Sequence, residues 1–328
     1  MTIAGAWHAA SQRIDRLDAR LLVEQVTACT HADLLAHPAR SLSTDQLSRL
    51  DALVGRRAGG EPLAYLLGSA AFYGREFWVT PAVLIPRPET ELLVELAIER
   101  VQPHSGARIL DLGTGSGVLA VTLGCLCPEA RLTAVDLSVA ALAVASSNAA
   151  RHAVEIDFRA GQWFSPLGEE RFNLIVANPP YVAQGDPHLQ QNGLPFEPQM
   201  ALTDGVVGGD GLACIRLVVG GAAVHLRPGG WLLVEHGYDQ AGAVRELLHR
   251  QGFEFEAHLF GEDGLKEEFA FPHVKHGILS PAGLAELYRS CDIGVVFSTT
   301  NYSLVPLEMM ACGLPVVELD GESTRAVF

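Results

Sequence analysis

The sequence predicts an α/β fold built on a doubly wound parallel sheet, and three observations lead to this. From residue 107 onward, short apolar runs alternate with segments of roughly 10 to 15 residues that have helical periodicity, as in βαβ units. A glycine-rich turn at residues 113–117 directly follows the first apolar run. The chain has 328 residues, 48% apolar and 19% charged, which is enough apolar material for a large buried core.

Residues 1–70 predict a small helical domain that precedes the sheet. Apolar side chains recur at helical spacing over 17–26 and again over 47–53. Ser43 and Gln46 are three residues apart, as in a capping box, where each side chain accepts the other residue's backbone N–H. We therefore expect the second of these helices to begin just after Ser43.

Residues 71–106 predict a β-hairpin and a linker helix. The stretch 72–84 has strand-like apolar positions, with a turn at 73–74. Two prolines in 85–88 push the residues before them into extended backbone. The acids in 89–91 then predict the start of a helix, because carboxylates are favourable near a helix N-terminus.

Strands and helices alternate over residues 107–253, the predicted catalytic domain. Successive strands with helices between them should lie parallel in one sheet, whose ligands bind at the carboxyl ends of the strands. The expected strands are 108–112, 131–135, one that ends before Trp163, 172–177 and 230–235, and the expected helices are 118–126, 138–151, 211–226 and 240–251.

The turn after the first strand is the first candidate binding element. Glycine has no Cβ, so the backbone can turn tightly and approach a ligand, and the helix beyond it offers free N–H groups to a carboxylate. The next strand ends in Asp136, which can accept hydrogen bonds from both ribose hydroxyls of an adenosyl group. NAD enzymes also use an acid here, so Asp136 indicates an adenosine ligand without choosing between cofactors. The candidate loop residues are Gly113, Thr114, Gly115, Ser116 and Gly117.

Trp163 follows the point where the third strand should end. Its flat indole is suited to packing on an adenine ring. A tryptophan at this position can equally be part of the core, and the sequence alone does not decide between the two.

The most specific motif, Asn178-Pro179-Pro180-Tyr181, follows the strand 172–177. A planar amide or amine nitrogen is a poor nucleophile because its lone pair is delocalised. The Asn178 side-chain oxygen and the Pro179 carbonyl can accept hydrogen bonds from both N–H groups and so aim the lone pair at a methyl donor. The prolines stiffen the loop, and Tyr181 can stack on the planar group. The motif predicts in-line displacement at a sulfonium methyl, driven by positioning and desolvation, with no metal.

Composition excludes several classes of protein. No apolar run approaches the ~20 residues of a membrane-spanning helix, and residues 1–16 lack the apolar core of a secretory signal. The six cysteines are scattered and form no C-x-x-C pair, which predicts free thiols in a reducing cytoplasm and neither a disulfide framework nor a zinc site. The net charge of −15 argues against a nucleic-acid substrate, since proteins that bind DNA usually carry a basic surface.

These motifs together resemble the release-factor glutamine methyltransferases, the HemK-type enzymes, over residues 1 to about 253. The resemblance implies a class I S-adenosylmethionine-dependent (Rossmann-like) methyltransferase in the cytoplasm, whose substrate is the glutamine of a Gly-Gly-Gln loop in class I peptide chain release factors. By resemblance S-adenosyl-L-methionine contacts residues 113–117, Asp136, Trp163 and Asn178, and the substrate amide lies at 178–181. The motifs that carry the resemblance are residues 60–68, 72–74, 84–91, 113–117, 178–181, 196–198 and 235–237.

One position departs from the family pattern, and other interpretations stay open. In the family an acid usually precedes the tryptophan, whereas this chain has Gln162, which loosens the expected contact with adenine. Relatives that methylate a ribosomal large-subunit protein share the Asn-Pro-Pro-Tyr motif without the linker 87–91. Adenine-N6 DNA methyltransferases share the tetrapeptide too. A further alternative is a module that binds cofactor but has lost its activity.

The tail, residues 254–328, does not match the end of this family. It resembles part of the nucleotide-sugar-binding half of a glycosyltransferase, notably at 276–280, 291–294 and 306–317, although Thr300 stands where those enzymes have a second glutamate. The stretch 253–260 can form one strand whose usual antiparallel partner is missing. We interpret the tail as the product of a fusion or of a mis-joined gene, without sugar transfer of its own.

Overall fold

The computed structural model describes residues 1–101, 106–237 and 240–253, together with four short strands beyond them. It forms two compact units, residues 1–237 and 238–328. Within the described residues, no helix is long and apolar enough to cross a membrane.

The first unit begins with a cluster of helices. Leu22 and Val26 are buried on one face of the second helix, whereas Leu17 is exposed. The predicted capping box is confirmed: Gln46 N donates to Ser43 Oγ at 3.1 Å, and Ser43 N donates to Gln46 Oε1 at 2.9 Å. The helices are α1 (Ile3–Ser11), α2 (Arg16–Thr27), α3 (His31–Ala36), α4 (Thr44–Ala58) and α5 (Leu63–Leu67).

A short hairpin follows, with β1 (Ser69–Phe72) antiparallel to β2 (Arg75–Trp78). Its two turn residues, Tyr73 and Gly74, have φ of 49° and 68°, as in a two-residue turn that matches the strand twist. The second strand ends at Trp78, before the end of the predicted stretch. Arg87 is extended, as the flanking prolines predict, and leads into η1 (Pro88–Thr90) and α6 (Glu91–Val101).

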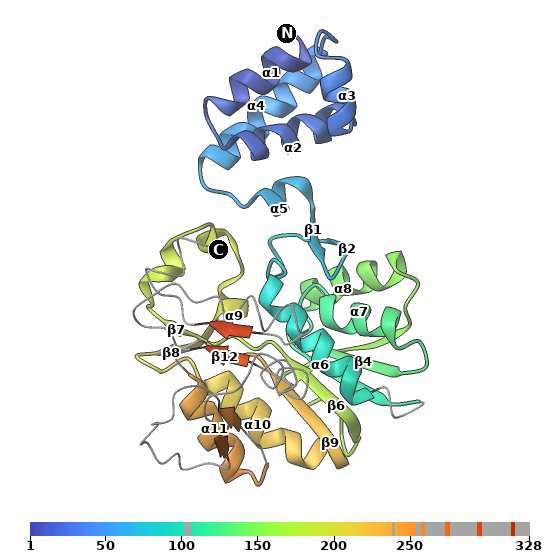
Figure 1. The fold of residues 1–328 in the computed structure, drawn as a ribbon, viewed down its shortest axis with the longest axis vertical. Coiled ribbons are helices and arrows are strands. Elements are labelled where there is room, and N and C mark those ends of the chain that lie inside the picture. The colour runs from blue at the N-terminus through green and yellow to red at the C-terminus, as the bar shows by residue number, and fades with distance from the viewer. Residues whose placement is uncertain are drawn as a thin grey trace. The chain divides into compact units, whose positions relative to one another are not determined.

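Five strands form the parallel sheet within the described residues (Figure 1), in the order β5-β4-β3-β6-β9. The central pair is buried on both faces: Ile109, Leu110, Leu174 and Ile175 are at most 1% exposed. Such two-sided burial explains why these strands are continuous apolar runs. The strands are β3 (Arg108–Leu112), β4 (Arg131–Asp136), β5 (Ile156–Ala160), β6 (Phe172–Ala177) and β9 (Leu226–Val234).

Helices cover the sheet, and the hydrophobic core lies between them and the strands. On one face α6, α7 (Val118–Leu126) and α8 (Val139–Arg151) pack side by side, and their apolar side chains join those of β3, β4 and β6 in a single cluster. α10 (Ala213–His225) packs on β6 and β9. Short elements after β6 complete the unit: β7 (Val182–Gln184), η2 (Pro187–Gln190), η3 (Leu194–Phe196), α9 (Gln199–Leu202) and β8 (Thr203–Val207).

The strand order determines where a ligand can bind. The chain moves from β3 outward to β4 and β5, then returns to β6 on the other side of β3. The loops after β3 and β6 therefore diverge and leave a crevice between them, which is the binding position in open α/β sheets. The candidate residues predicted from the sequence lie at this edge, at or beyond the carboxyl ends of the strands.

The second unit contains α11 (Ala241–Arg250) and two parallel strand pairs. β10 (Ala257–Leu259), inside the strand predicted at 253–260, pairs with β11 (His273–Lys275) in parallel, not with an antiparallel partner. β12 (Gly294–Val296) likewise pairs with β13 (Val316–Glu318). Most of the glycosyltransferase-like positions, including 276–280 and Thr300, lie outside the described residues.

Candidate functional site

The loop after β3 is held in one conformation by backbone contacts. Gly113, Gly115 and Gly117 have φ of 74°, 55° and 83°, a region that side chains with a Cβ rarely occupy. The Gly113 and Thr114 N–H groups donate to Val135 O at 2.8 and 3.1 Å, so the loop folds over the end of β4. The glycine-rich turn therefore presents bare backbone toward the crevice.

Asp111, the last but one residue of β3, supports this loop from below. Its Oδ2 accepts hydrogen bonds from Thr114 Oγ1 at 2.6 Å and Ala120 N at 3.2 Å, while its buried Oδ1 has no protein partner. Burial is the main cause that raises the pKa of Asp111 to about 7. Buried polar atoms rarely stay unpaired, so the orphaned oxygen fits a polar ligand in the crevice.

Asp136 and Trp163 lie on the other side of the same loop. Asp136 accepts Gly115 N through Oδ2 and Ser138 N through Oδ1, both at 2.8 Å, and burial raises its pKa. Each carboxylate oxygen keeps a second lone pair, which is what the predicted ribose contact requires. The indole of Trp163 lies beside Gly113: a Cβ built on that glycine would be 3.6 Å from the ring. The residues predicted for adenosine binding are thus gathered at one corner, and their donors and acceptors fit an adenosyl cofactor.

Asn178 lies across the crevice in a chain of hydrogen bonds. Its Nδ2 donates to Thr90 Oγ1 at 2.9 Å, and the Thr90 hydroxyl donates to Glu235 Oε2 at 2.7 Å. The Tyr181 hydroxyl donates to the other oxygen of Glu235 at 3.0 Å. Glu235 N donates to Ala177 O at 2.9 Å, so the ends of β6 and β9 bring this carboxyl group next to the Asn178 loop.

The interior around Asn178 is partly shielded from solvent. Burial is the main cause of the raised pKa values of Glu235 and Tyr181. Pro179 is buried and Pro180 half-buried, which agrees with a stiff loop. A cavity of about 50 Å³ opens here, and it is lined by Leu84, Arg87, Asn178, Pro179, Tyr181, Val182, Ala201 and Leu202.

An ion pair with a buried carboxylate ties the linker to this cavity. The Glu197 side chain, 2% exposed, accepts Arg87 Nη2 at 2.6 Å and Ile85 N at 2.9 Å. The link joins residues more than a hundred positions apart in the chain. It fixes the extended linker against the segment after the Asn178 loop, and so shapes one wall of the cavity.

Replacing Glu197 with alanine should lower the free energy of unfolding by about 2 kcal/mol, because Ile85 N loses its buried acceptor and the partly exposed Arg87 loses its ion-pair partner. The matched control is Asp51→Ala, which breaks an exposed pair with Arg13 and should cost less than about 1 kcal/mol. Urea denaturation of both variants measures the difference. Equal costs would show that the Glu197 pair has no special role.

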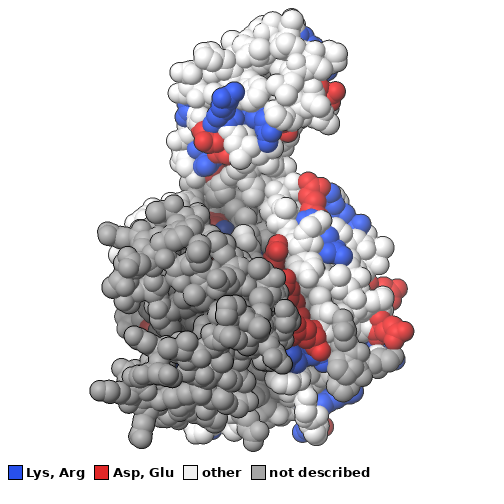
Figure 2. Space-filling view, viewed as in Figure 1, with Lys and Arg blue, Asp and Glu red and all other residues white. Residues whose placement is uncertain are grey.

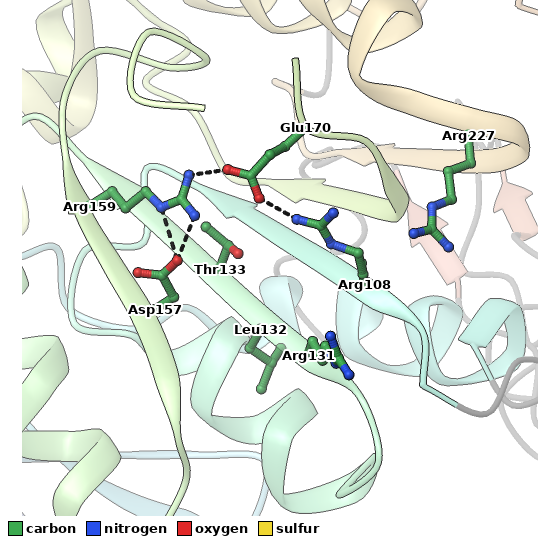
Figure 3. A pocket seen from close by; sticks show the side chains of 8 residues that line it. All are labelled: Arg108, Arg131, Leu132, Thr133, Asp157, Arg159, Glu170 and Arg227. Carbon is green, nitrogen blue, oxygen red and sulfur yellow. Dashed lines mark hydrogen bonds and ion pairs between the residues drawn. The ribbon is translucent and has the colours of Figure 1, made fainter. Parts of the chain in front are cut away.

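A larger cavity, about 450 Å³, lies at the other end of the strands and includes Arg108 and Arg131, the first residues of β3 and β4 (Figure 3). Glu170 bridges Arg108 and Arg159, and Arg159 also pairs with Asp157 at 2.6 Å. Arg108 and Asp157 lie at or near the amino ends of β3 and β5, and the Arg159 side chain, from the far end of β5, reaches Asp157 and the Glu170 segment before β6. The cavity is therefore remote from the strand ends where the candidate residues gather.

Three residues at the crevice were not assigned roles from the sequence: Thr90, Asp111 and Glu235. Thr90 and Glu235 stand inside the motifs at 84–91 and 235–237, and Asp111 lies two residues before the glycine-rich turn, so the motifs marked their neighbourhood. Their roles depend on which strand ends are adjacent, and only the strand order supplies that.

Comparison with known proteins places the chain in a family. Residues 8–68 match the PrmC N-terminal domain, and residues 89–192 match the methyltransferase small domain. The chain is 48% identical over 245 residues to the release factor glutamine methyltransferase of Xylella fastidiosa, which covers 74% of this chain and 88% of that protein. It is 48% identical over 240 residues to the one of Bordetella pertussis, with 73% and 88% covered.

Solved structures give looser matches. The ribosomal protein L11 methylase of Lactobacillus delbrueckii subsp. bulgaricus aligns with a TM-score of 0.39 and 22% identity, over 53% of this chain and 73% of that one. The 16S rRNA N2 G1207 methyltransferase of T. thermophilus, solved with AdoMet and guanosine, aligns with a TM-score of 0.42 and 25% identity, over 56% and 44%.

The parallel sheet and the match to a methyltransferase domain confirm the predicted fold class, and the cofactor of that class is S-adenosylmethionine. The high identity extends over about three quarters of this chain and covers most of each relative's length. The chain therefore belongs to the family of release factor glutamine methyltransferases.

Proposed function

We propose that this protein transfers a methyl group to the side-chain amide nitrogen of the glutamine in the Gly-Gly-Gln motif of class I peptide chain release factors, in the cytoplasm. The observation that carries the proposal is the position of Asn178 in the lining of a small cavity, at the end of a strand next to the one that leads into the glycine loop. The division into domains at residues 70, 106 and 253 is part of the same proposal.

The residues of the site divide the work between them. S-adenosylmethionine supplies the electrophilic methyl group when it is bound. Asn178 Oδ1 and the Pro179 carbonyl accept hydrogen bonds from the two N–H groups of the substrate amide, which holds the nitrogen in line for attack. The buried wall around Tyr181 excludes water, so these polar contacts act in a low dielectric.

DNA adenine methylation comes after glutamine methylation. A base-modifying enzyme must hold an extruded nucleotide and the phosphates on either side of it.

Surface charge favours the same choice. Glu91, Glu95 and Glu99 are spaced one turn apart on α6, and burial together with repulsion from the other two raises the pKa of Glu95. Figure 2 shows acidic side chains in a row over this helix. A phosphate backbone would be repelled there. A glutamine of a ribosomal large-subunit protein is the second candidate, since the amide chemistry would be the same.

The proposal predicts that label from radioactive S-adenosylmethionine enters a release factor at its Gly-Gly-Gln glutamine. The panel contains the release factor, the same factor with that glutamine changed to alanine, a ribosomal large-subunit protein fraction and DNA. Label should enter the first and be lost in the second. Label in DNA adenine or in the ribosomal fraction alone would contradict the proposal, and cofactor binding without any transfer would indicate an inactive module.

A further inference from the structure

We propose that Glu235 is a positioning residue that determines which way round the Asn178 side-chain amide lies. The inference rests on the proposed function, in which Asn178 must offer its oxygen to the substrate. An asparagine amide has an acceptor end and a donor end of almost the same shape. Only one of its two orientations can accept a hydrogen bond from the substrate N–H.

The orientation follows from the hydrogen-bond chain itself. An ionised carboxylate only accepts hydrogen bonds, so the single proton of the Thr90 hydroxyl must point to Glu235 Oε2, 2.7 Å away. Thr90 Oγ1 has then no proton for Asn178 and can only accept. The atom 2.9 Å from it must therefore be Nδ2, not Oδ1.

This orientation leaves Oδ1 as the end of the amide that is available to a substrate. The pKa of Glu235 agrees with it, because the nearby Asn178 amide lowers that pKa against the effect of burial, as a donor that faces a carboxylate does.

Glu235 also fixes the other side of the loop. The Tyr181 hydroxyl donates to Oε1 at 3.0 Å, so the two ends of the Asn178–Tyr181 motif are held by one carboxyl group. Glu235 is positioned in turn by the ladder bond from its own N–H to Ala177 O. The end of β9 therefore determines how the Asn178 amide and the Tyr181 hydroxyl group are oriented.

A glutamine at position 235 would remove the constraint without changing the size of the side chain. Its amide carries both a donor and an acceptor, so Thr90 could donate in either direction and Asn178 could lie either way round. Glu235→Gln should therefore lower kcat by roughly 10- to 100-fold, as a small misplacement at a reacting group does. The KM for release factor should change little, because the contact acts mainly in the transition state.

Thr90 offers a conservative rescue. Thr90→Ser keeps the hydroxyl group that links Asn178 to Glu235, and its kcat should stay within a few fold of wild type. The nearly isosteric Thr90→Val removes that hydroxyl group, and its kcat should fall as far as that of Glu235→Gln. Glu169→Gln, an exposed position before Glu170 at the opposite edge of the sheet, is the matched control and should behave as wild type.

The spectroscopic test needs no substrate. The side-chain NH₂ signal of Asn178, assigned by its loss in Asn178→Ala, should exchange slowly with solvent in the wild type and in Thr90→Ser. It should exchange faster in Glu235→Gln and Thr90→Val. If Glu235→Gln leaves either kcat or this exchange unchanged, the inference is overturned. If the wild type methylates no release factor, the proposed function fails while the exchange data still decide the orientation of Asn178.

Discussion

Asn178→Ala should reduce methyl transfer to a release factor by roughly 100- to 1000-fold or more, which is the scale of losing a preorganised hydrogen-bonding group at the reacting atom. The reason is geometric: the alanine offers no acceptor to the substrate N–H, so the amide nitrogen is no longer held in line with the methyl donor. Cofactor affinity should stay within about tenfold of wild type, because the lost contact acts mainly in the transition state.

Single-turnover methylation and calorimetric cofactor binding test the two halves of this prediction separately. Asn173→Ala is a suitable control because it changes the same residue type on the same strand, β6, at the opposite edge. Asn173 Oδ1 accepts Arg108 N at 3.0 Å, so its loss should affect stability and leave the transfer rate near wild type. Near-normal turnover in Asn178→Ala would show that the assigned mechanism is wrong.

The sequence predicted the central strands of the sheet well, because β3, β4 and β6 are short, largely buried and separated by helices. The strands 108–112 and 172–177 have the predicted bounds, and the helix predicted at 118–126 is α7. In each case a continuous apolar run or helical periodicity marks the element, and a glycine or proline ends it. The bounds of these elements depend on neighbouring residues in the chain, so they can be predicted from the sequence without knowledge of the fold.

Elements whose pairing is distant in sequence were not predicted. β7 and β8 are short, only partly buried and separated by about twenty residues, so no local pattern marks them. The Thr90–Glu235 contact joins residues 145 positions apart. It exists because β6 and β9 are neighbours in the sheet and α6 begins beside their ends, which a single sequence does not reveal.

In the tail, the sequence predicted a strand but not the strand with which it pairs. An alternating run at 253–260 was enough to predict one strand, and β10 lies inside it. The choice of partner depends on which edge is free when that segment folds, and the parallel pairing with β11 was not foreseen. Pairing direction is a property of topology, not of alternation.

Asp136→Ala should weaken the binding of S-adenosylmethionine by about 1.5–3 kcal/mol, or roughly 10- to 150-fold in Kd, for the loss of hydrogen bonds to a charged group. The carboxylate has two tasks here, since it also accepts Gly115 N and Ser138 N at 2.8 Å and so shapes the glycine loop. Its partial burial strengthens both contacts. At saturating cofactor the transfer rate should recover to within about tenfold of wild type, the opposite of Asn178→Ala.

Asp157→Ala is the matched control for Asp136→Ala. Asp157 lies on β5 and pairs with Arg159 at 2.6 Å, so its replacement removes an exposed carboxylate from the same sheet and should leave Kd unchanged. Calorimetry of both variants is the measurement, and a wild-type Kd for Asp136→Ala would exclude this residue from the cofactor site.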